Sequence, residues 1–255
     1  MLEKYRKYKF LFKQLVKRDF TRKYKRTVLG MAWSIISPLA NLLIMYLVFS
    51  RLFGNNVNHY AIYLFAGQLV FSYFTDATNM GMSALLNNAG IFTKVNVPKY
   101  LFLFSQNVSS LINFALTMVV FFVFVAIEGI PFSWKFLLLL FPTGCMILFN
   151  TGLGLILSAL QVFFRDMQYL WGIMTQLIMW VSAIFYTLDS FTPMFRRLLY
   201  CNPLFVYITY FRQIVLNGAV PSPALHGLCA LYALLAFAVG CIMYKRYNQE
   251  FLYYV

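Results

Sequence analysis

Residues 100–127 read YLFLFSQNVSSLINFALTMVVFFVFVAI, 28 residues without a charged side chain. A bilayer core about 30 Å thick is crossed by roughly 20 apolar helical residues, so this stretch is long enough to span a membrane. The rest of the chain is similar, because 62% of its 255 residues are hydrophobic, 11% are charged, and the mean hydropathy is +0.71. This composition excludes a soluble globular enzyme and predicts an all-α polytopic membrane protein.

Uncharged runs between charged residues predict six transmembrane helices. The predicted spans are 31–50, 60–86, 100–127, 136–164, 167–188 and 224–244. A further apolar run, 200–211, has prolines on both sides and about 12 residues, too few to cross a bilayer. We therefore expect a re-entrant or interfacial segment in region 189–223, between the fifth and sixth helices.

The distribution of Lys and Arg predicts the orientation of these spans. With six spans, 16 of the 21 basic residues lie on the side of the two termini and five lie on the other side. Positive charge is retained on the cytoplasmic side of short loops, so both termini are expected to be cytoplasmic.

Residues 1–28 carry 11 of the basic residues and are predicted to form a cytoplasmic amphipathic helix in the membrane interface. The apolar side chains that recur at helical spacing between the lysines are Tyr5, Tyr8, Phe12, Leu15 and Val16. Positive-inside topogenesis explains the same charges equally well. The net charge of +14 is concentrated here, which favours membrane lipids as partners and argues against nucleic acid. Residues 29–255 then form the transmembrane domain.

The sequence lacks the motifs of metal-binding, catalytic and nucleotide-binding sites. The four cysteines show no paired ligand spacing, and His59 and His226 are isolated, so neither a metal site nor a catalytic residue is expected. Gly152-Leu153-Gly154 lies inside a predicted span and favours close helix packing. No G-x-x-x-x-G-K-[ST] motif occurs, so no cofactor is expected on this chain and any ATP must be bound by another.

Asp76 is the one acidic residue inside a predicted span. An ionised Asp at the bilayer centre costs roughly 2.5 to 3.5 kcal/mol even on insertion scales. The residue therefore either faces a hydrated interior or a partner subunit, near Tyr73, or is a neutral, hydrogen-bonded structural group. A secondary transporter would show more such groups and internal repeats, and the two halves of the chain show no repeat.

Motifs along nearly the whole chain resemble those of the ABC-2 type polysaccharide export permeases, which include O-antigen, teichoic-acid and capsule exporters. They are Asp19, Tyr24-Lys25-Arg26, Leu29-Gly30, Trp33, Pro38, Asn88, Ile91, Lys94-Val95, Pro98-Lys99, Phe164-Arg165-Asp166, Ser182 to Tyr186, Asn202-Pro203-Leu204 and Arg212. Three positions depart from the family pattern. Thr93 replaces a second lysine, Val97 replaces an aromatic residue, and Ala183 replaces a proline.

The resemblance implies a permease of the bacterial cytoplasmic (inner) membrane that exports a lipid-linked glycan. Two copies of the chain would pair with two copies of a separate ABC ATPase that binds ATP and Mg. The cytoplasmic link 89–99 would be the coupling segment seated in the ATPase, although a plain turn is the alternative. Arg165 and Asp166 offer a second contact or a salt-bridged helix end. The expected coupling residues are Asn88, Ile91, Lys94, Pro98, Lys99, Arg165 and Asp166.

The aromatic content of 20% suits a glycan substrate, because sugar rings stack on aromatic side chains. The residues expected to line a translocation path are Phe71, Tyr73, Asp76, Phe185 and Tyr186. Six helices enclose little space, so the path is expected at the two-fold interface of a homodimer. An ABC-2 efflux permease for drugs or small lipids is the main alternative. A membrane transferase or a channel is a third class, but neither a catalytic pair nor a ring of charges is evident.

Overall fold

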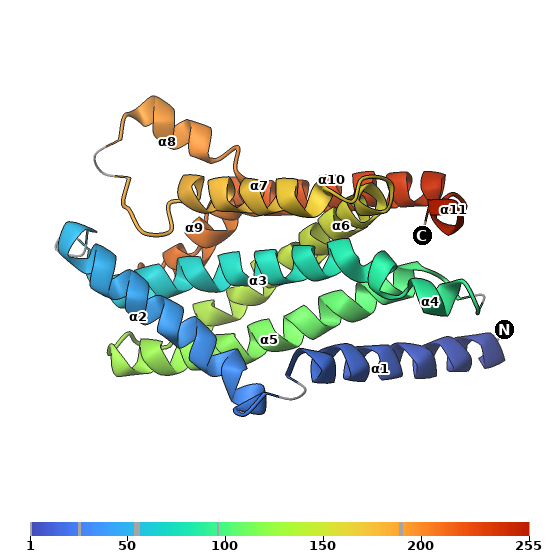
Figure 1. The fold of residues 1–255 in the computed structure, drawn as a ribbon. Helices are drawn as coiled ribbons and strands as arrows, with labels where there is room; N and C mark the ends of the chain where they lie inside the picture. The colour runs from blue at the N-terminus through green and yellow to red at the C-terminus, as the bar shows by residue number, and fades with distance from the viewer. Residues whose placement is uncertain (1, 25–26, 54–56, 96, 189–190, 255) are drawn as a thin grey trace.

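A computed structural model describes residues 2–24, 27–53, 57–95, 97–188 and 191–254. Lys25 and Arg26 lie outside the described residues, as does the side chain of Tyr5. The described part is helical and contains no strand (Figure 1). Its elements are α1 (Leu2–Tyr24), η1 (Gly30–Ala32), α2 (Trp33–Phe53), α3 (Tyr60–Asn87), α4 (Ala89–Phe92), α5 (Tyr100–Ile127), η3 (Trp134–Leu139), α6 (Leu140–Phe163), α7 (Met167–Val181), α8 (Pro193–Leu199), α9 (Pro203–Val215), α10 (Pro223–Tyr247) and α11 (Phe251–Tyr254).

Within the described residues, four helical segments are long and apolar enough to cross a membrane: Gly30–Phe53, Tyr100–Ile127, Trp134–Phe163 and Pro223–Tyr247. They match the first, third, fourth and sixth predicted spans. The helix of the second span, α3, has 28 residues but is less apolar. The helix of the fifth, α7, has only 15 residues and ends at Val181, whereas the prediction continued to residue 188. The count of six spans therefore stays a prediction.

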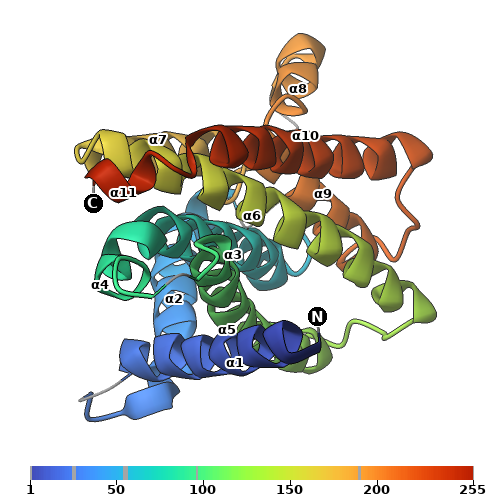
Figure 2. The ribbon, with the colours of Figure 1, turned by 90° about the vertical axis from the view of Figure 1, so that its right-hand side faces the viewer.

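Helix α3 lies at the centre of the bundle, between α5 and α6 (Figure 2). Most of its apolar side chains are buried, with Ile62, Leu64 and Phe65 fully enclosed. Aromatic rings fill much of the space, since Phe65 meets Phe121 of α5 edge-on at 5.4 Å between ring centroids. The largest buried cluster is built around this helix.

Helix α6 crosses α10 at glycines, as the Gly152-Leu153-Gly154 pattern predicted. A Cβ atom added at Gly152 would lie 2.4 Å from the backbone of Ala236, and one at Gly240 would lie 2.5 Å from the carbonyl oxygen of Gly152. On the other side of α6, a Cβ at Gly81 would lie 2.9 Å from the Cα of Gly154. Only glycine permits backbones to approach this closely, so these residues fix α6 between α3 and α10.

The basic N-terminal arm is helical, as predicted, and packs against α5. Leu15 and Asp19 are buried at this contact, while Phe10 on another face is 67% exposed. The two termini and α4 lie at the same end of the bundle (Figure 1). This arrangement agrees with an even number of crossings, but which side faces the cytoplasm rests on the charge distribution.

The region after α7 contains two short helices, and capping residues in the sequence determine where each one begins. The side chains of Thr192 and Asn202 cap α8 and α9, and each is followed by proline at the first helical position. Helix α9 has 13 residues, too few to span a bilayer, yet Tyr207, Tyr210 and Phe211 on it are fully buried. A re-entrant course for α9 remains a prediction.

Candidate functional site

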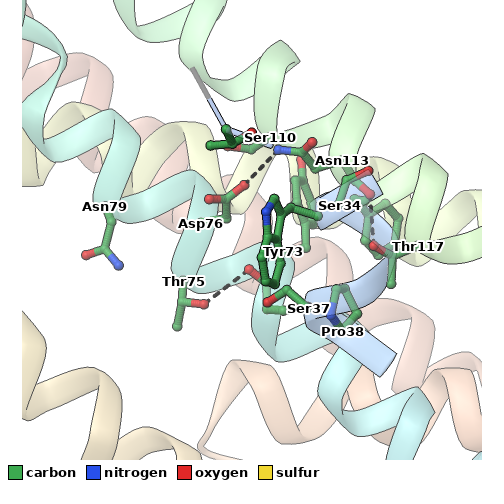
Figure 3. A pocket seen from close by; sticks show the side chains of 14 residues that line it. Ser34, Ser37, Pro38, Tyr73, Thr75, Asp76, Asn79, Ser110, Asn113 and Thr117 are labelled. Carbon is green, nitrogen blue, oxygen red and sulfur yellow. Dashed lines mark hydrogen bonds between the residues drawn. The ribbon is translucent and has the colours of Figure 1, made fainter. Parts of the chain in front are cut away.

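A cavity of about 610 Å³ opens between α2, α3 and α5, and most of its lining side chains carry hydroxyl or amide groups (Figure 3). The lining residues are Thr27, Trp33, Ser34, Ser37, Pro38, Ser72, Tyr73, Thr75, Asp76, Asn79, Ser110, Asn113, Phe114 and Thr117. Polar groups of this kind inside a membrane bundle face an interior or a water-filled space, because lipid offers them no hydrogen bonds.

Asp76 lies in the wall of this cavity and accepts a hydrogen bond from Nδ2 of Asn113 at 3.3 Å (Figure 3). It also lines a second cavity of about 310 Å³, which includes Asp19 and Arg22 of α1. Asp76 is half-buried, so its carboxylate is accessible from both spaces. This placement fits both a residue that faces a hydrated interior and a hydrogen-bonded structural group, so both interpretations stay predictions.

The two cavities lie along one polar face of α3. Ser72, Asp76, Asn79, Ser83 and Asn87 recur every three or four residues, which places them on one side of a helix. None of these five residues is buried, whereas most other residues of α3 are. Of these five residues, only Asp76 was identified from the sequence. The 3.6-residue period of small polar residues was the signal that would have identified the whole face.

Tyr73 and Phe71 are more enclosed than Asp76, at 2% and 8% exposure. The hydroxyl of Tyr73 donates to Oδ1 of Asn107 at 3.2 Å, and Nδ2 of Asn107 donates to the hydroxyl of Thr151 at 2.8 Å. This chain of hydrogen bonds links α3, α5 and α6 beneath the cavity. Tyr73 therefore presents an edge to the cavity and uses its polar end to hold the helices together.

Phe185 and Tyr186 lie in the turn that follows α7. Phe185 is 2% exposed, and its ring stacks on Phe49 of α2 with centroids 4.8 Å apart. Tyr186 is half-buried and donates from its hydroxyl to the carbonyl of Trp180 at 3.0 Å. In this conformation Phe185 offers no ring face to a sugar, whereas Tyr186 retains partial access.

The turn is held by Arg212 of α9, which sequence analysis had named only as a family motif. Its guanidinium donates to the carbonyls of Ala183 and Ile184, both at 2.8 Å, and to that of Tyr63 at 3.0 Å. It also lies 3.4 Å above the ring centroid of Tyr63. Ala183 has φ of 50°, a strained value for a residue with a side chain, so these bonds stabilise the bend.

At the opposite end of α3, Asn88 joins the amphipathic helix to the predicted coupling segment. Asn88 is 1% exposed and accepts a 2.6 Å hydrogen bond from Nη2 of Arg18. Arg18 also pairs with Asp19 at 2.6 Å, and Asp19 accepts from the hydroxyl of Ser105 on α5 at 2.9 Å. Asn88 is thus a buried link between α1, α3 and α5 and is not itself a free docking surface.

The predicted coupling segment 89–99 begins with the short helix α4 and then turns into α5. Lys94 is exposed, and Ile91 and Pro98 are half-buried. Lys99 points inward, with 9% exposure, and its Nζ donates to the backbone carbonyl of Asn248. Of the two lysines, only Lys94 presents its charge to a partner.

Arg165 and Asp166 lie exposed in the connection between α6 and α7. Neither forms an ion pair with any residue that the structure describes, so a second contact and a salt-bridged helix end both stay predictions. Among the described residues no group of three His, Cys, Asp or Glu side chains could hold a metal ion.

The sequence of this chain matches a known protein family. The profile of the ABC-2 type transporter family matches residues 10–216. The chain belongs to the ABC-2 type transporter family. This match includes the polar face of α3, the segment 89–99 and Arg212.

Three relatives of this ABC-2 chain match almost end to end. The O-antigen export system permease protein RfbA of Myxococcus xanthus is 27% identical over 96% of this chain and 95% of its own length. The polysialic acid transport protein KpsM of Escherichia coli is 22% identical over 92% of each chain. The capsule polysaccharide export inner-membrane protein CtrC of Neisseria meningitidis serogroup B is 21% identical over 92% of this chain and 90% of its own length.

Proposed function

We propose that this chain is the permease subunit of an ATP-driven exporter that moves a polysaccharide across the bacterial inner membrane. The relatives support this substrate class, because their names describe O-antigen export, polysialic acid transport and capsule polysaccharide export. They favour it over the efflux of drugs or small lipids. A lipid-linked form of the glycan remains part of the proposal.

The observation that carries a transport role is the polar face of α3. A 28-residue helix at the centre of a membrane bundle leaves Ser72, Asp76 and Asn79 open to a cavity rather than to packed neighbours. Short hydroxyl and amide side chains can exchange hydrogen bonds with water or with sugar hydroxyls. A surface with many weakly binding polar groups suits transport, because the substrate must bind favourably and also dissociate easily.

The proposed assembly contains two copies of this chain and two copies of an ABC ATPase that binds ATP and Mg. Lys94 on the segment 89–99 and the exposed pair Arg165 and Asp166 lie on connections that the charge distribution places in the cytoplasm. They are the proposed contacts with the ATPase. A second copy of the chain would complete the translocation path, with Tyr186 as its partly accessible aromatic residue.

Deletion of the chain tests the proposed function directly. Cells lacking it should accumulate one glycan in the cytoplasm, and the purified complex should contain an ABC ATPase. Normal surface glycan together with increased sensitivity to a small apolar compound would instead support the efflux alternative.

Cysteine labelling tests the polar face independently of the substrate. In a variant without the four native cysteines, Asn79→Cys and Ser83→Cys should react quickly with a polar maleimide, because thiolate forms only where water reaches. Val119→Cys on α5 is the matched control, since Val119 is 62% exposed on an apolar surface. Equal reaction at Val119→Cys would refute a specifically hydrated face on α3.

A further inference from the structure

A groove of about 420 Å³ lies between the start of α5 and the end of α10, apart from the polar face of α3. Its walls include Tyr100 and Phe104 of α5, with Leu155 of α6 between the two helices. Two lysines, Lys99 and Lys245, belong to the same lining. The groove thus combines an apolar wall with two cations at one end.

Lys99 is a buried cation without an anionic partner among the described residues. It is 9% exposed, donates to the carbonyl of Asn248, and lies 5.7 Å and 5.5 Å from the ring centroids of Phe92 and Phe251. Burial lowers the pKa of its ammonium group, because an apolar environment disfavours the charged form. An anion placed beside it would offset this penalty.

Tyr244 supplies a second unsatisfied group in the same lining. It is 7% exposed, and its hydroxyl forms no hydrogen bond with any residue that the structure describes. Cys241, Tyr244, Lys245 and Asn248 recur at three- and four-residue spacing, so they present one face of the α10 end to the groove. A buried hydroxyl lacking a partner is unfavourable, so an acceptor that reached it from the groove would be stabilised.

We propose that this groove binds an anionic phospholipid of the inner leaflet. The phosphate would accept hydrogen bonds from Lys99, Lys245 and the Tyr244 hydroxyl, and an acyl chain would lie against Leu155, Phe104 and Tyr100. The charge distribution places this end of the bundle at the cytoplasmic surface, where anionic headgroups are attracted by Lys and Arg. Basic pockets between membrane helices on this side recognise such headgroups.

Native mass spectrometry of the full purified chain tests the site, with phosphatidylglycerol and phosphatidylcholine as probes. The wild-type chain should retain phosphatidylglycerol preferentially. Lys245→Gln should weaken that retention about fivefold, which corresponds to about 1 kcal/mol for one basic residue near an anionic headgroup. Lys245 is exposed, so this substitution leaves the core intact. Tyr244→Phe should weaken retention by a smaller factor while preserving the ring.

Arg246→Gln is the matched control, because Arg246 is the adjacent exposed cation and does not line the groove. It should leave the retention of phosphatidylglycerol unchanged. Equal losses in Lys245→Gln and Arg246→Gln would overturn the site in favour of a general surface charge effect. Tighter retention of a polyprenyl phosphate than of phosphatidylglycerol, abolished by Lys245→Gln, would overturn its assignment to a membrane phospholipid.

Discussion

Replacing Gly152 by alanine probes the crossing of α6 and α10 directly. The added Cβ would lie 2.4 Å from both the carbonyl carbon and oxygen of Ala236 and 2.5 Å from the nitrogen of Phe237. Ordinary contacts begin near 3.4 Å, so the backbone of α10 must retreat by about 1 Å. No side-chain rotation can relieve the clash, because the added Cβ would contact backbone atoms of α10.

Two opposing effects set the expected change in the free energy of unfolding. Alanine favours a helix interior over glycine by about 1 kcal/mol, which stabilises the variant. Overpacking in a close-packed interior costs about 1 to 3 kcal/mol, and a backbone clash lies at the upper end of that range. The net expectation for Gly152→Ala is a destabilisation of about 1 to 2 kcal/mol.

Gly144→Ala on the same helix separates these two effects. A Cβ at Gly144 meets no atom within 4 Å, so only the helix preference acts and the variant should be more stable than wild type by about 1 kcal/mol. Unfolding in mixed micelles of a mild detergent and dodecyl sulfate, followed by tryptophan fluorescence, would measure both. A Gly152→Ala variant as stable as Gly144→Ala would refute the close approach of α6 and α10.

Four further outcomes are expected. Lys94→Glu should reduce co-purification of the ATPase or uncouple hydrolysis from export, whereas Lys94→Gln should have a smaller effect because it removes the charge without reversing it; normal export with Lys94→Glu would exclude the contact. Asp76→Asn should slow glycan export while preserving the amount of protein, because the amide keeps the shape and removes the charge; unchanged export across pH would show that ionisation there is irrelevant. Arg212→Lys should lower the stability of the purified chain by about 2 to 4 kcal/mol in the same unfolding assay, since one ammonium cannot replace a planar guanidinium on three carbonyls; wild-type stability would contradict the clamp. Phe185→Ala should lower the free energy of unfolding by about 3 to 5 kcal/mol, and Phe185→Leu should lower it by less. If Phe185→Ala were fully stable but no longer supported export, Phe185 would instead stack on the sugar.

The sequence alone predicted those features of the fold and the family that have a strong local pattern. Uncharged runs identified the four apolar spans because their length alone matches a bilayer. The pattern Gly152-Leu153-Gly154 predicted close packing, and the glycines of α6 do meet both α3 and α10. The order of motifs along the chain identified the family, which the profile match over residues 10–216 confirmed.

The end of α7 could not be predicted because its cause is distant in the chain. Residues 182–188 are as apolar as the helix before them, so composition predicts that the helix continues. The bend is stabilised by Arg212, 29 residues from Ala183, and by the hydroxyl of Tyr60, which donates to the carbonyl of Phe185 at 2.6 Å. Gly67 leaves room for the guanidinium, since a Cβ there would lie 3.0 Å from Nη2 of Arg212.

Burial also changes the expected roles of individual site residues. Lys94 and Lys99 look equivalent in the sequence, five residues apart on one link, but only Lys94 is exposed. The sequence predicts Asn88 as a contact residue of the coupling region, yet it is enclosed by Arg18 and by the carbonyl of Ala84, which accepts from Nδ2 of Asn88 at 2.7 Å. Such differences depend on which helices meet, and a single sequence does not encode those contacts locally.

Helix α3 connects the polar face to the predicted coupling segment 89–99. Its polar face begins at Ser72 and ends at Asn87, next to Asn88 and α4, so 15 residues or about 22 Å of continuous helix separate the two ends. A helix packed on both sides moves as a rigid element. In the proposed assembly, movement of α4 by an ATPase would therefore tilt the polar face about the contact of Gly81 with Gly154, midway along that stretch. The buried link from Asn88 to Arg18 would carry the same displacement to α1, which lines the second cavity through Asp19 and Arg22.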